Sequence, residues 1–191
     1  MLIKTFVEDE EYHGTDFSGG QFKIGTYENC NFQNCNFSGS DLSEALFIDC
    51  EFIDCELSMV TIHNASFRKV NFKLCKLLGV RFEDSNQLIL SMNFEDCQLN
   101  IASFFKVSLK NTTFKDSNLQ EVDFTEADLT KSTFDNCNLA GTIFENTVLE
   151  GVDFQTSYSY SLDPEQNKIK GAKFSKLDVI GLLDKYNIDI L

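Results

Sequence analysis

The sequence predicts an all-β solenoid built from four-sided coils and ending in a short C-terminal α-helix. Three observations lead to this prediction. A large apolar residue recurs at every fifth position over 135 of the 191 residues. The residue two places before it is usually small, and the other three positions of each unit are mostly polar. A period of five fits neither the 3.6-residue turn of an α-helix nor the two-residue alternation of a strand, so the repeat itself defines the architecture.

The repeat forms two tracts, over residues 15–84 and 92–156, with 27 units in all. The large positions of the first tract are Phe17, Phe22, Tyr27, Phe32, Phe37, Leu42, Phe47, Phe52, Leu57, Ile62, Phe67, Phe72, Leu77 and Phe82. Those of the second are Phe94, Leu99, Phe104, Leu109, Phe114, Leu119, Phe124, Leu129, Phe134, Leu139, Phe144, Leu149 and Phe154. We therefore expect residues 1–191 to form a single solenoid domain.

Each unit turns two side chains inward and three outward, as the stretch from Ala127 to Lys131 illustrates. Ala127 and Leu129 would line the interior, whereas Asp128 and Thr130 would face solvent. A chain with this pattern turns a corner at every unit, and four sides close a coil of about 20 residues. Coils that stack at the strand spacing of ~4.8 Å give about seven coils and a rod of about 33 Å.

A second period lies within the first, because Phe and Leu alternate without exception from Phe94 onward. With four sides to a coil, this alternation places Phe on two opposite faces. Two aromatic columns are predicted, one of Phe94, Phe114, Phe134 and Phe154, the other of Phe104, Phe124 and Phe144. The aromatic residues are therefore assigned to the core, where a buried Phe contributes roughly 1.5–3 kcal/mol.

All seven cysteines occupy the small position of a unit: Cys30, Cys35, Cys50, Cys55, Cys75, Cys97 and Cys137. Their spacing follows the repeat and matches no zinc or redox motif. Cys35, Cys55 and Cys75 are each separated by four units, or one full coil, and are expected to stack in one column, poorly aimed for disulfides. We interpret them as small buried hydrophobes, and buried reduced thiols favour a cytoplasmic location.

The repeat is interrupted between Phe82 and Phe94, whose separation exceeds that of two repeat units by two positions. These two extra positions in the register shift at 83–93 predict a bulge over Ser85, Asn86, Gln87, Leu88, Ile89, Leu90 and Ser91. One interpretation is a packed bulge that seats the next coil. The other is a small loop that contacts a partner.

The C-terminal segment, residues 157–191, contains one degenerate unit and then a predicted α-helix. Ile169 and Phe174 are five apart, with Ala172 at the small position. Ser175 and Asp178 have capping-box spacing at the start of the helix. The apolar residues that follow are candidates for a homodimer interface: Val179, Ile180, Leu182, Leu183, Tyr186, Ile188, Ile190 and Leu191. The segment can cover the open end of the last coil, join two rods about a two-fold axis, or do both.

The net charge of −14 is unevenly distributed. Residues 1–56 carry −10 and residues 116–154 carry −8, whereas residues 57–82 hold five bases and no acid. Those bases are Arg68, Lys69, Lys73, Lys76 and Arg81, and we expect them on different faces of the rod. The acidity can serve solubility alone, or it can give the rod a charge like that of a DNA duplex. Because this surface repels nucleic acid, no direct nucleic-acid binding is expected.

The sequence predicts no catalytic residue, no metal site and no cofactor. Its two histidines, His13 and His63, are at terminal or outward positions, and phosphate-loop and nucleophile-elbow motifs are absent from the sequence. A solenoid wall also offers no closed cleft that would shift the pKa of a carboxyl. No apolar stretch reaches the ~20 residues of a membrane span, and the start of the chain lacks signal-peptide features. We therefore expect a non-enzymatic protein without a membrane segment.

The units resemble the pentapeptide-repeat family, whose consensus is A-(D/N)-L-x-x. Residues 127–131 read Ala-Asp-Leu-Thr-Lys and residues 40–44 read Ser-Asp-Leu-Ser-Glu. The resemblance implies a right-handed quadrilateral β-helix.

Within this family the chain resembles the Qnr-like and mycobacterial quinolone-resistance proteins in its length, its all-repeat body and its end region, where Leu162-Asp163-Pro164 precedes Leu182 and Leu183. That resemblance implies a dimer joined through C-terminal helices that mimics DNA and binds DNA gyrase and topoisomerase IV. The chain departs from the Qnr proteins in having one short bulge where they have two long loops, which puts drug resistance in doubt.

Two functional hypotheses follow. One is a DNA mimic that modulates a type II topoisomerase through an acidic surface of Asp116, Glu121, Asp123, Glu126, Asp128, Asp135, Glu145, Glu150 and Asp153. The alternative is an interaction scaffold for an unrelated protein partner, with the bulge as the contact.

Overall fold

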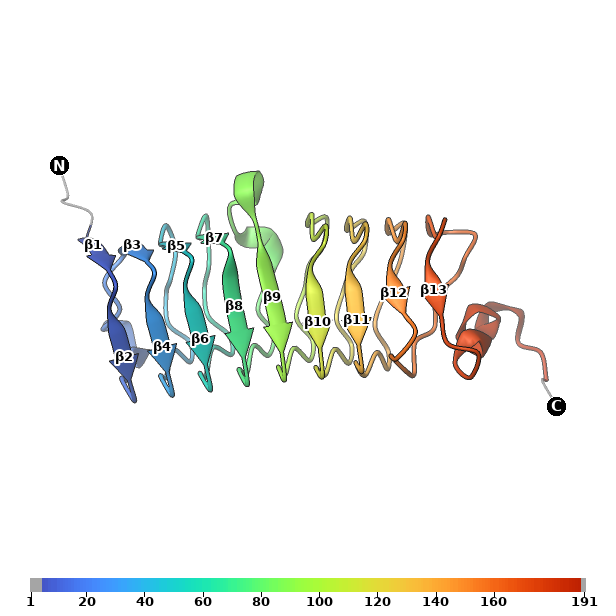
Figure 1. Ribbon diagram of the computed structural model, residues 1–191, viewed down its shortest axis with the longest axis horizontal. Coiled ribbons are helices and arrows are strands. Elements are labelled where there is room, and N and C mark those ends of the chain that lie inside the picture. The colour runs from blue at the N-terminus through green and yellow to red at the C-terminus, as the bar shows by residue number, and fades with distance from the viewer. Residues whose placement is uncertain (1–4, 190–191) are drawn as a thin grey trace.

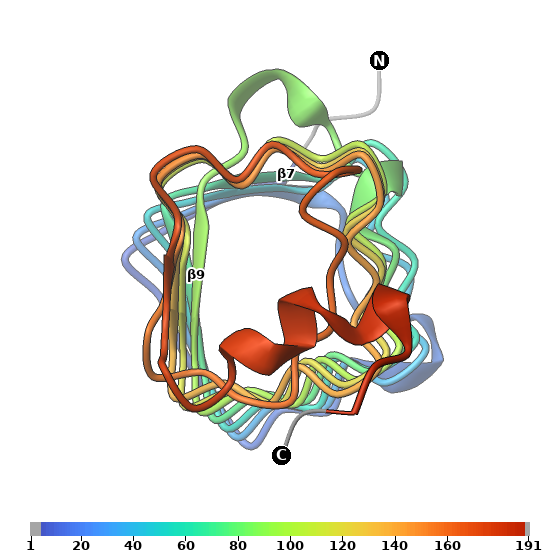
Figure 2. The same cartoon turned by 90° about the vertical axis from the view of Figure 1, so that its right-hand side faces the viewer.

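The protein forms a straight, four-sided rod of stacked coils, seen from the side in Figure 1 and along its axis in Figure 2. The structure is a computed structural model that describes residues 5–189. All strand pairs are parallel, and they form one sheet of nine strands and one of four. The prediction of an all-β solenoid is therefore confirmed.

The two sheets occupy two adjoining sides of the rod. The four-stranded sheet contains β1 (Thr5–Glu8), β3 (Gly25–Glu28), β5 (Leu46–Ile48) and β7 (Ser66–Arg68). The nine-stranded sheet contains β2 (Glu11–His13), β4 (Asn31–Gln33), β6 (Glu51–Ile53), β8 (Val70–Lys73), β9 (Met92–Glu95), β10 (Thr113–Lys115), β11 (Thr133–Asp135), β12 (Asp153–Phe154) and β13 (Lys173–Phe174). The other two sides are held by single β-bridges between successive coils. A short 3₁₀ helix, η1 (Ser18–Gly20), lies in the first coil.

Each corner of the coil is a tight turn that begins at a large apolar residue. At the corner after Leu119, the Val122 amide donates a hydrogen bond to the Leu119 carbonyl at 3.1 Å, and Glu121 between them has a φ of 58°. A positive φ at the third residue is the geometry of a type II turn, which favours Gly and Asn. Asn, Asp and Gly are frequent at this position, so the polar corner residues of the repeat have a conformational role as well as a solvent-facing one.

The predicted aromatic columns are present. In the second tract, the rings of Phe94, Phe114 and Phe134 stack at 5.1 and 4.9 Å. Phe104 and Phe124 form the facing column at 5.2 Å, and rings of the two columns meet edge to face. Stacked and edge-to-face arrangements both suit the quadrupole of an aromatic ring. The interior of the rod is therefore a packed aromatic core.

The cysteine column is also present, and it is longer than predicted. The Cys35 amide donates to Cys55 Sγ at 3.4 Å, which places these two thiols one above the other. The column continues past Cys75 to Cys97, Ser117, Cys137 and Ser157, and the amides of Cys97 and Cys137 donate to the next hydroxyl at 3.0 and 3.1 Å. The predicted column ends at Cys75, because the insertion moves Cys97 by two positions from the register of the earlier coils and serines occupy two of the later places. All seven thiols are buried and free.

The solenoid extends beyond the predicted repeats at both ends. Tyr12 stacks on Phe32 at 4.9 Å, and Val7 packs against the core, so a further half coil of two units precedes residue 15. The sequence hid this half coil because Glu10, at one of its small positions, is neither small nor apolar. At the other end Phe154 stacks on Phe174 at 5.5 Å, which confirms the degenerate unit. The rod therefore has about eight coils rather than seven, and nine stacked strands at ~4.8 Å give a length of about 38 Å.

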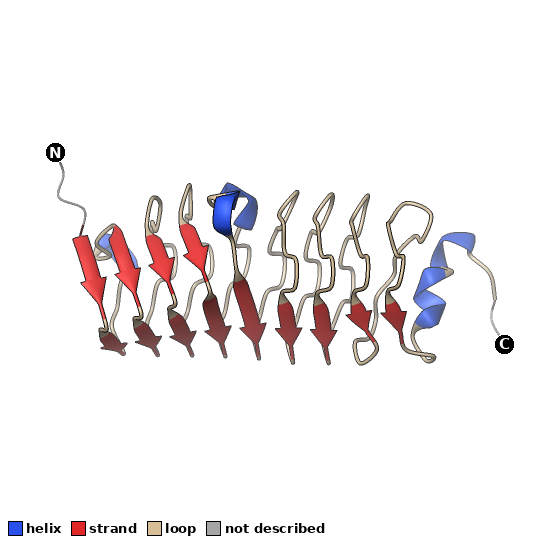
Figure 3. Cartoon of the chain, turned by 45° about the horizontal axis from the view of Figure 1, so that its top comes forward, coloured by secondary structure: helices blue, strands red, loops and turns tan. Residues whose placement is uncertain are grey.

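The interruption of the repeat is a bulge on the side of the four-stranded sheet, as Figures 2 and 3 show. It contains two 3₁₀ helices, η2 (Phe82–Asp84) and η3 (Gln87–Ile89). Before the bulge, strand partners such as Phe52 and Phe72 are one regular coil apart, whereas across it Val70 pairs with Met92. The predicted two-position shift is thus confirmed, and the added residues project from the rod.

The predicted C-terminal α-helix is wrong. The chain instead forms two 3₁₀ helices, η4 (Val179–Leu182) and η5 (Asp184–Tyr186), across the open end of the rod. The Ser175–Asp178 contact forms, because Ser175 Oγ accepts from the Asp178 amide at 2.9 Å. It lies in the turn before η4, however, and Asp178, the N-cap of η4, makes no side-chain capping bond, so Ser175 does not cap the helix as expected. The tertiary reason is Gly181, whose carbonyl accepts from the Leu162 amide and whose Cα lies so close to the Tyr160 carbonyl that a Cβ would fall 1.9 Å from its oxygen. This contact presses the segment flat onto the last coil and leaves no space for an α-helix with side chains all round.

Candidate interaction surfaces

The outward side chains of the rod form four faces. The sheet face is the outer surface of the nine-stranded sheet, and the bulge face is that of the four-stranded sheet together with the bulge and Ser108, Asp128, Val148 and Lys168. The amide face follows the bridges Lys76, Gln98, Asn118, Asn138 and Tyr158. The acidic face follows Asp41 and Thr61, and then Arg81, Ser103, Asp123 and Ile143.

The nine candidate carboxylates are distributed over these faces. Asp116, Asp135 and Asp153 belong to the sheet face, Glu121 to a corner of the amide face, Asp123, Glu126 and Glu145 to the acidic face, and Asp128 and Glu150 to the bulge face. The fold thus brings Asp123, Glu126 and Glu145 together but does not gather all nine into one patch.

Four of the nine carboxylates have a lysine partner. Glu126 pairs with Lys106 at 3.5 Å and Asp128 with Lys110 at 3.0 Å. Asp116 lies 3.8 Å from Lys115, and Asp153 lies 3.0 Å from Lys173. Partial burial tends to raise the pKa of Asp128, but hydrogen bonds from Thr130 and Lys110 outweigh it and lower that pKa. All four lysines come from outside residues 116–154, so flanking coils partly neutralise the acidic tract.

The other five carboxylates have no ion-pair partner among residues 5–189. They are Glu121, Asp123, Asp135, Glu145 and Glu150. Asp123 and Glu145 lie on successive coils of the acidic face. This face therefore carries the most open negative charge of the C-terminal half.

Apart from Glu121 at one of its corners, the amide face is uncharged over three successive coils, which the sequence analysis did not detect. Its outward residues there are Gln98, Asn100, Asn118, Gln120, Asn138 and Ala140. The Asn118 side-chain Nδ2 donates to Gln98 Oε1 at 3.4 Å, so the column is linked along the rod. The face can be found in the sequence by grouping the outward residues of every fourth unit, since these stack on one side of the rod. The charge around the rod is therefore one-sided and not uniform.

The five bases of residues 57–82, here called the waist, lie on different faces of the rod, as predicted. Lys69 pairs with Asp49 at 3.2 Å, Lys73 with Glu95 at 3.4 Å and Lys76 with Glu56 at 3.6 Å, each on a different face. Arg81 on the acidic face pairs with Glu83 at 3.2 Å. Arg68 alone has no carboxylate partner within residues 5–189.

The bulge has a packed part and an exposed part, so the packing alternative is confirmed and the partner contact stays a prediction. Leu90 packs against the core and Ser85 is buried, which seats the next coil. The Gln87 side-chain amide donates to the Phe82 carbonyl at 2.9 Å, and Asn86 Oδ1 accepts from the Leu88 amide at 3.0 Å. This bonding holds Leu88 outward with 89% of its surface exposed, and Ile89 with 58%.

The end of the chain from Ser175 to Asp189, here called the tail, likewise has a packed side and an open side. Leu182 packs against the core at the end of the rod and caps the last coil. Lys185 Nζ anchors the tail to Asp163 at 2.7 Å and to Glu165 at 2.6 Å. The remaining described candidates are exposed: Val179, Ile180, Leu183, Tyr186 and Ile188. Ile190 and Leu191 lie outside the described residues.

Comparison with known families identifies the repeat. The profile described as "Pentapeptide repeat region" matches residues 25–88 and 88–159. The chain belongs to the pentapeptide-repeat family. No curated protein sequence matches it.

Solved structures of QnrB1, described as a plasmid-mediated fluoroquinolone resistance protein, are similar to this pentapeptide-repeat protein. The full-length form shares 20% identity at a TM-score of 0.63, over 96% of this chain and 100% of that one. A trypsin-treated form shares 21% identity at a TM-score of 0.62, over 99% of this chain and 100% of that one. This similarity confirms the pentapeptide-repeat fold.

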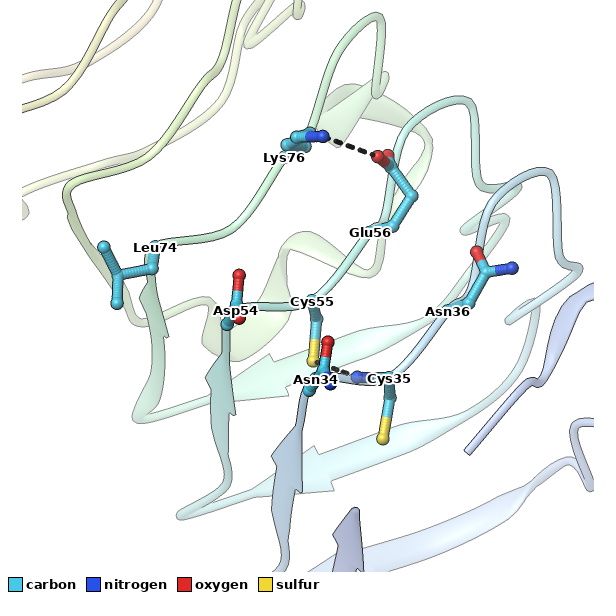
Figure 4. Close-up of a pocket in the computed structure, with 8 residues that line it drawn as sticks. All are labelled: Asn34, Cys35, Asn36, Asp54, Cys55, Glu56, Leu74 and Lys76. Atoms are coloured by element: carbon cyan, nitrogen blue, oxygen red, sulfur yellow. Dashed lines mark hydrogen bonds and ion pairs between the residues drawn. The ribbon is translucent and has the colours of Figure 1, made fainter. Parts of the chain in front are cut away.

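A depression of about 210 Å³ at the corner between the sheet face and the amide face illustrates how the repeat handles its thiols (Figure 4). Cys35 and Cys55 lie beneath its polar rim and are 2% exposed. Burial raises the pKa of Cys35, and the Cys75 contact together with burial raises that of Cys55. Because the thiolate is the reactive form, these cysteines of the pentapeptide-repeat protein are structural.

The remaining polar groups of residues 5–189 show no cluster of three or more His, Cys, Asp or Glu side chains arranged to hold a metal. The two histidines, His13 and His63, are exposed. Over the same residues, no helix has the length and apolar character needed to cross a membrane. The site candidates of this pentapeptide-repeat protein are therefore its faces, its bulge and its tail.

Proposed function

We propose that this protein is a non-enzymatic DNA mimic that binds a type II topoisomerase, DNA gyrase or topoisomerase IV, in the cytoplasm. The observation that carries the proposal is the acidic C-terminal half. Residues 116–154 hold nine carboxylates and Lys131 as their one base. This stretch makes about two coils, or ~10 Å of rod, so its net charge of −8 amounts to roughly one charge per 1.2 Å. Duplex DNA carries one charge per ~1.7 Å of axis. The four flanking lysines reduce the density of this stretch to roughly one charge per 2.4 Å, which is lower than that of the duplex but of the same order.

The one-sided charge supports a defined way of binding. A cationic saddle that holds DNA would accept the acidic face, where Asp123 and Glu145 are unpaired among the described residues, and the adjoining sheet and bulge faces. The uncharged amide face would point away from the saddle. Electrostatic complementarity of this kind accelerates association and weakens with salt.

A homodimer joined through the tail supports the same function. Exposed apolar side chains on η4 and η5, among them Ile180 and Leu183, form the two-fold contact in this proposal. The acidic halves of the two rods then adjoin the centre, and the particle is twice as long as one rod. The structural similarity to QnrB1, a fluoroquinolone resistance protein, supports a topoisomerase as the partner.

A supercoiling assay with purified gyrase, run from low to high salt, tests the proposal. We expect an effect on supercoiling at low salt that disappears as salt rises. Substituting Asp123→Lys and Glu145→Lys should abolish it, because both side chains present open negative charge. A matched control, Asp41→Lys with Asp54→Lys, makes the same charge change in the N-terminal half and should retain most of the effect. If the wild-type protein has no effect at low salt, the DNA-mimic proposal is wrong.

The second candidate function is an interaction scaffold with the bulge as its contact. It is favoured by one observation, the exposed pair of Leu88 and Ile89 held outward by hydrogen bonds. Replacing both with Ser separates the candidates. A DNA mimic should keep its effect on gyrase, whereas a scaffold that acts through the bulge should lose its partner.

A further inference from the structure

We propose that the N-terminal half of the bulge face binds a second copy of this chain, with the two rods side by side and antiparallel. This contact is separate from the tail contact and from the acidic surface. It rests on the pattern of side chains along one column of the four-stranded sheet.

That sheet has an exposed outer surface with two registered columns of side chains. One column contains Phe6, Thr26, Leu46 and Ser66, and the other contains Glu8, Glu28, Ile48 and Arg68. Phe6 is 60% exposed, and Leu46 and Ile48 are half-buried on the outside of the rod. Figure 3 shows the four strands side by side, with the bulge next to the last of them, β7. The patch therefore has apolar groups at its centre and one end, and charges along one column.

The charges of the second column are unmatched among the described residues. Glu8 and Glu28 lie at one end and Arg68 at the other, with Ile48 between them. Neither Glu8, Glu28 nor Arg68 has an ion-pair partner among residues 5–189, whereas the other four bases of the waist are all paired. Arg68 Nε is also shielded from solvent and makes no hydrogen bond within that part of the chain. This column thus offers both halves of an ion pair, but two coils apart.

An antiparallel second copy brings those halves together. A two-fold axis that lies in the contact plane, parallel to the strands, turns the column end for end, so that Arg68 of each rod faces the glutamates of the other. Centred on β5, the axis pairs Arg68 with Glu28 and sets Leu46 and Ile48 against their own copies. If the axis is moved from β5 by half a coil toward β3, Arg68 pairs with Glu8 of the other copy. The bulge then lies beyond the partner's first coil. Both registers give an isologous contact, in which the same patch serves both subunits.

The size of the patch predicts a weak contact. Four strands at ~4.8 Å give a patch about 20 Å long on one side of the rod, well below the ~800 Å² per partner of a standard interface. We therefore expect a dissociation constant of about 10–500 µM.

Sedimentation velocity over a range of protein concentrations tests the contact. The measurement uses the full chain with Ile180→Ser and Leu183→Ser, so that association through the tail is not mistaken for it. Two variants are made in this chain, R68E and the double variant E8R/E28R. Each alone should weaken association at least tenfold, because like charges then face each other. An equimolar mixture should recover it, because R68E chains present only acids along the column and E8R/E28R chains only bases.

A control variant, Glu150→Arg, makes a similar charge change on the same face beyond the bulge and should leave association unchanged. Circular dichroism of each variant checks that it is folded. Recovery in the mixture supports the proposal. Two results would overturn it: a parent chain that stays monomeric up to millimolar concentration, or folded variants whose mixture associates no better than either alone.

Discussion

The backbone of Met92 pairs with that of Val70 across a coil that is two positions longer than the one between Phe52 and Phe72. Despite this longer coil, the rings of Phe72 and Phe94 stack at 5.3 Å and within 9° of parallel. The core column therefore passes the insertion undisturbed, and the extra residues lie outside it. This separation of core from surface leads to the first prediction.

Deleting Gln87 and Leu88 should leave a folded rod without its bulge. The deletion restores a coil of four regular units, with Ile89 at the large position and Ser85 at the small one. We expect the thermal midpoint to remain within a few degrees, because no buried core residue is removed. Differential scanning calorimetry and circular dichroism check this result. Deleting Leu77 and Leu78 instead removes a core residue, shifts the register of every later coil, and should prevent folding.

Phe114→Ala should reduce the free energy of unfolding by about 3–5 kcal/mol, the usual cost of removing a buried aromatic ring. Phe114 is fully buried and stacks on Phe94 at 5.1 Å and on Phe134 at 4.9 Å. Leu88→Ala, at an 89% exposed position, should change it by less than ~0.5 kcal/mol. Urea denaturation measures both, and equal losses would contradict the aromatic column as the main source of stability.

Ile101→Asn should stabilise the protein by about 0.5–1 kcal/mol, because a β-branched residue is strained at positive φ and Asn tolerates it. Ile101 has a φ of 54° at a corner and is 57% exposed, so little apolar burial is lost. Ile143→Asn is the matched control, since Ile143 is 43% exposed and is not at a positive-φ corner. Chemical denaturation of both variants tests the idea. A gain in the control as large as that of Ile101→Asn would count against corner strain.

The seven thiols of the native protein should not react with a disulfide reagent such as DTNB near neutral pH. All seven are buried, and burial raises the pKa of Cys50 to about 11 and that of Cys137 to about 12. Because the thiolate is the attacking species, reaction should wait for unfolding. Spectrophotometry with and without denaturant measures this difference. Rapid reaction of one or more thiols in the folded protein would show that the coils open locally.

Lys185→Met should loosen the C-terminal tail while leaving the rod intact. Hydrogen bonds from Lys185 lower the pKa of Asp163 and of Glu165, and those carboxylates in turn raise the pKa of Lys185. The stabilisation from the two carboxylates is present above their ordinary pKa range and is lost as pH falls through the lowered values, below about pH 4. That from Lys185 is present below its ordinary pKa and is lost only in strong alkali. The contact is therefore fully formed around neutral pH.

Hydrogen exchange of the amides in η4 and η5 measures the attachment of the tail. At pH 7 the Lys185→Met variant should exchange several-fold faster than the wild type. Lys176→Met is the control, because Lys176 is exposed and has no ion pair within residues 5–189. At a pH below 4 the wild-type tail should approach the behaviour of the variant, after correction for the intrinsic exchange rate.

Most of the fold could be predicted because it depends on a local repeat. In every unit, such as Ala127 to Lys131, the alternation of small, large and polar residues indicates which side chains face inward. The coil, the aromatic columns and the insertion can therefore all be predicted from the sequence. The first half coil is not visible, because Glu10 occupies one of its small positions. The tail differs from its prediction for another reason. Its helical spacing is real, but Gly181 meets the Tyr160 carbonyl from the last coil, and no local pattern records that contact.

The sequence by itself determined the solenoid, its length to within about one coil, and the burial of all seven cysteines. The reason is local, because the small and large residues of each unit by themselves specify which side chains are buried. Only the tertiary structure decided which outward side chains find a partner and which stay open. That outcome depends on contacts between coils and not on the local five-residue pattern, because a carboxylate and a lysine pair only when their coils and side-chain conformations bring them together. The unpaired Arg68, the open carboxylates of the acidic face and the exposed side of the tail therefore appear only once the coils are stacked.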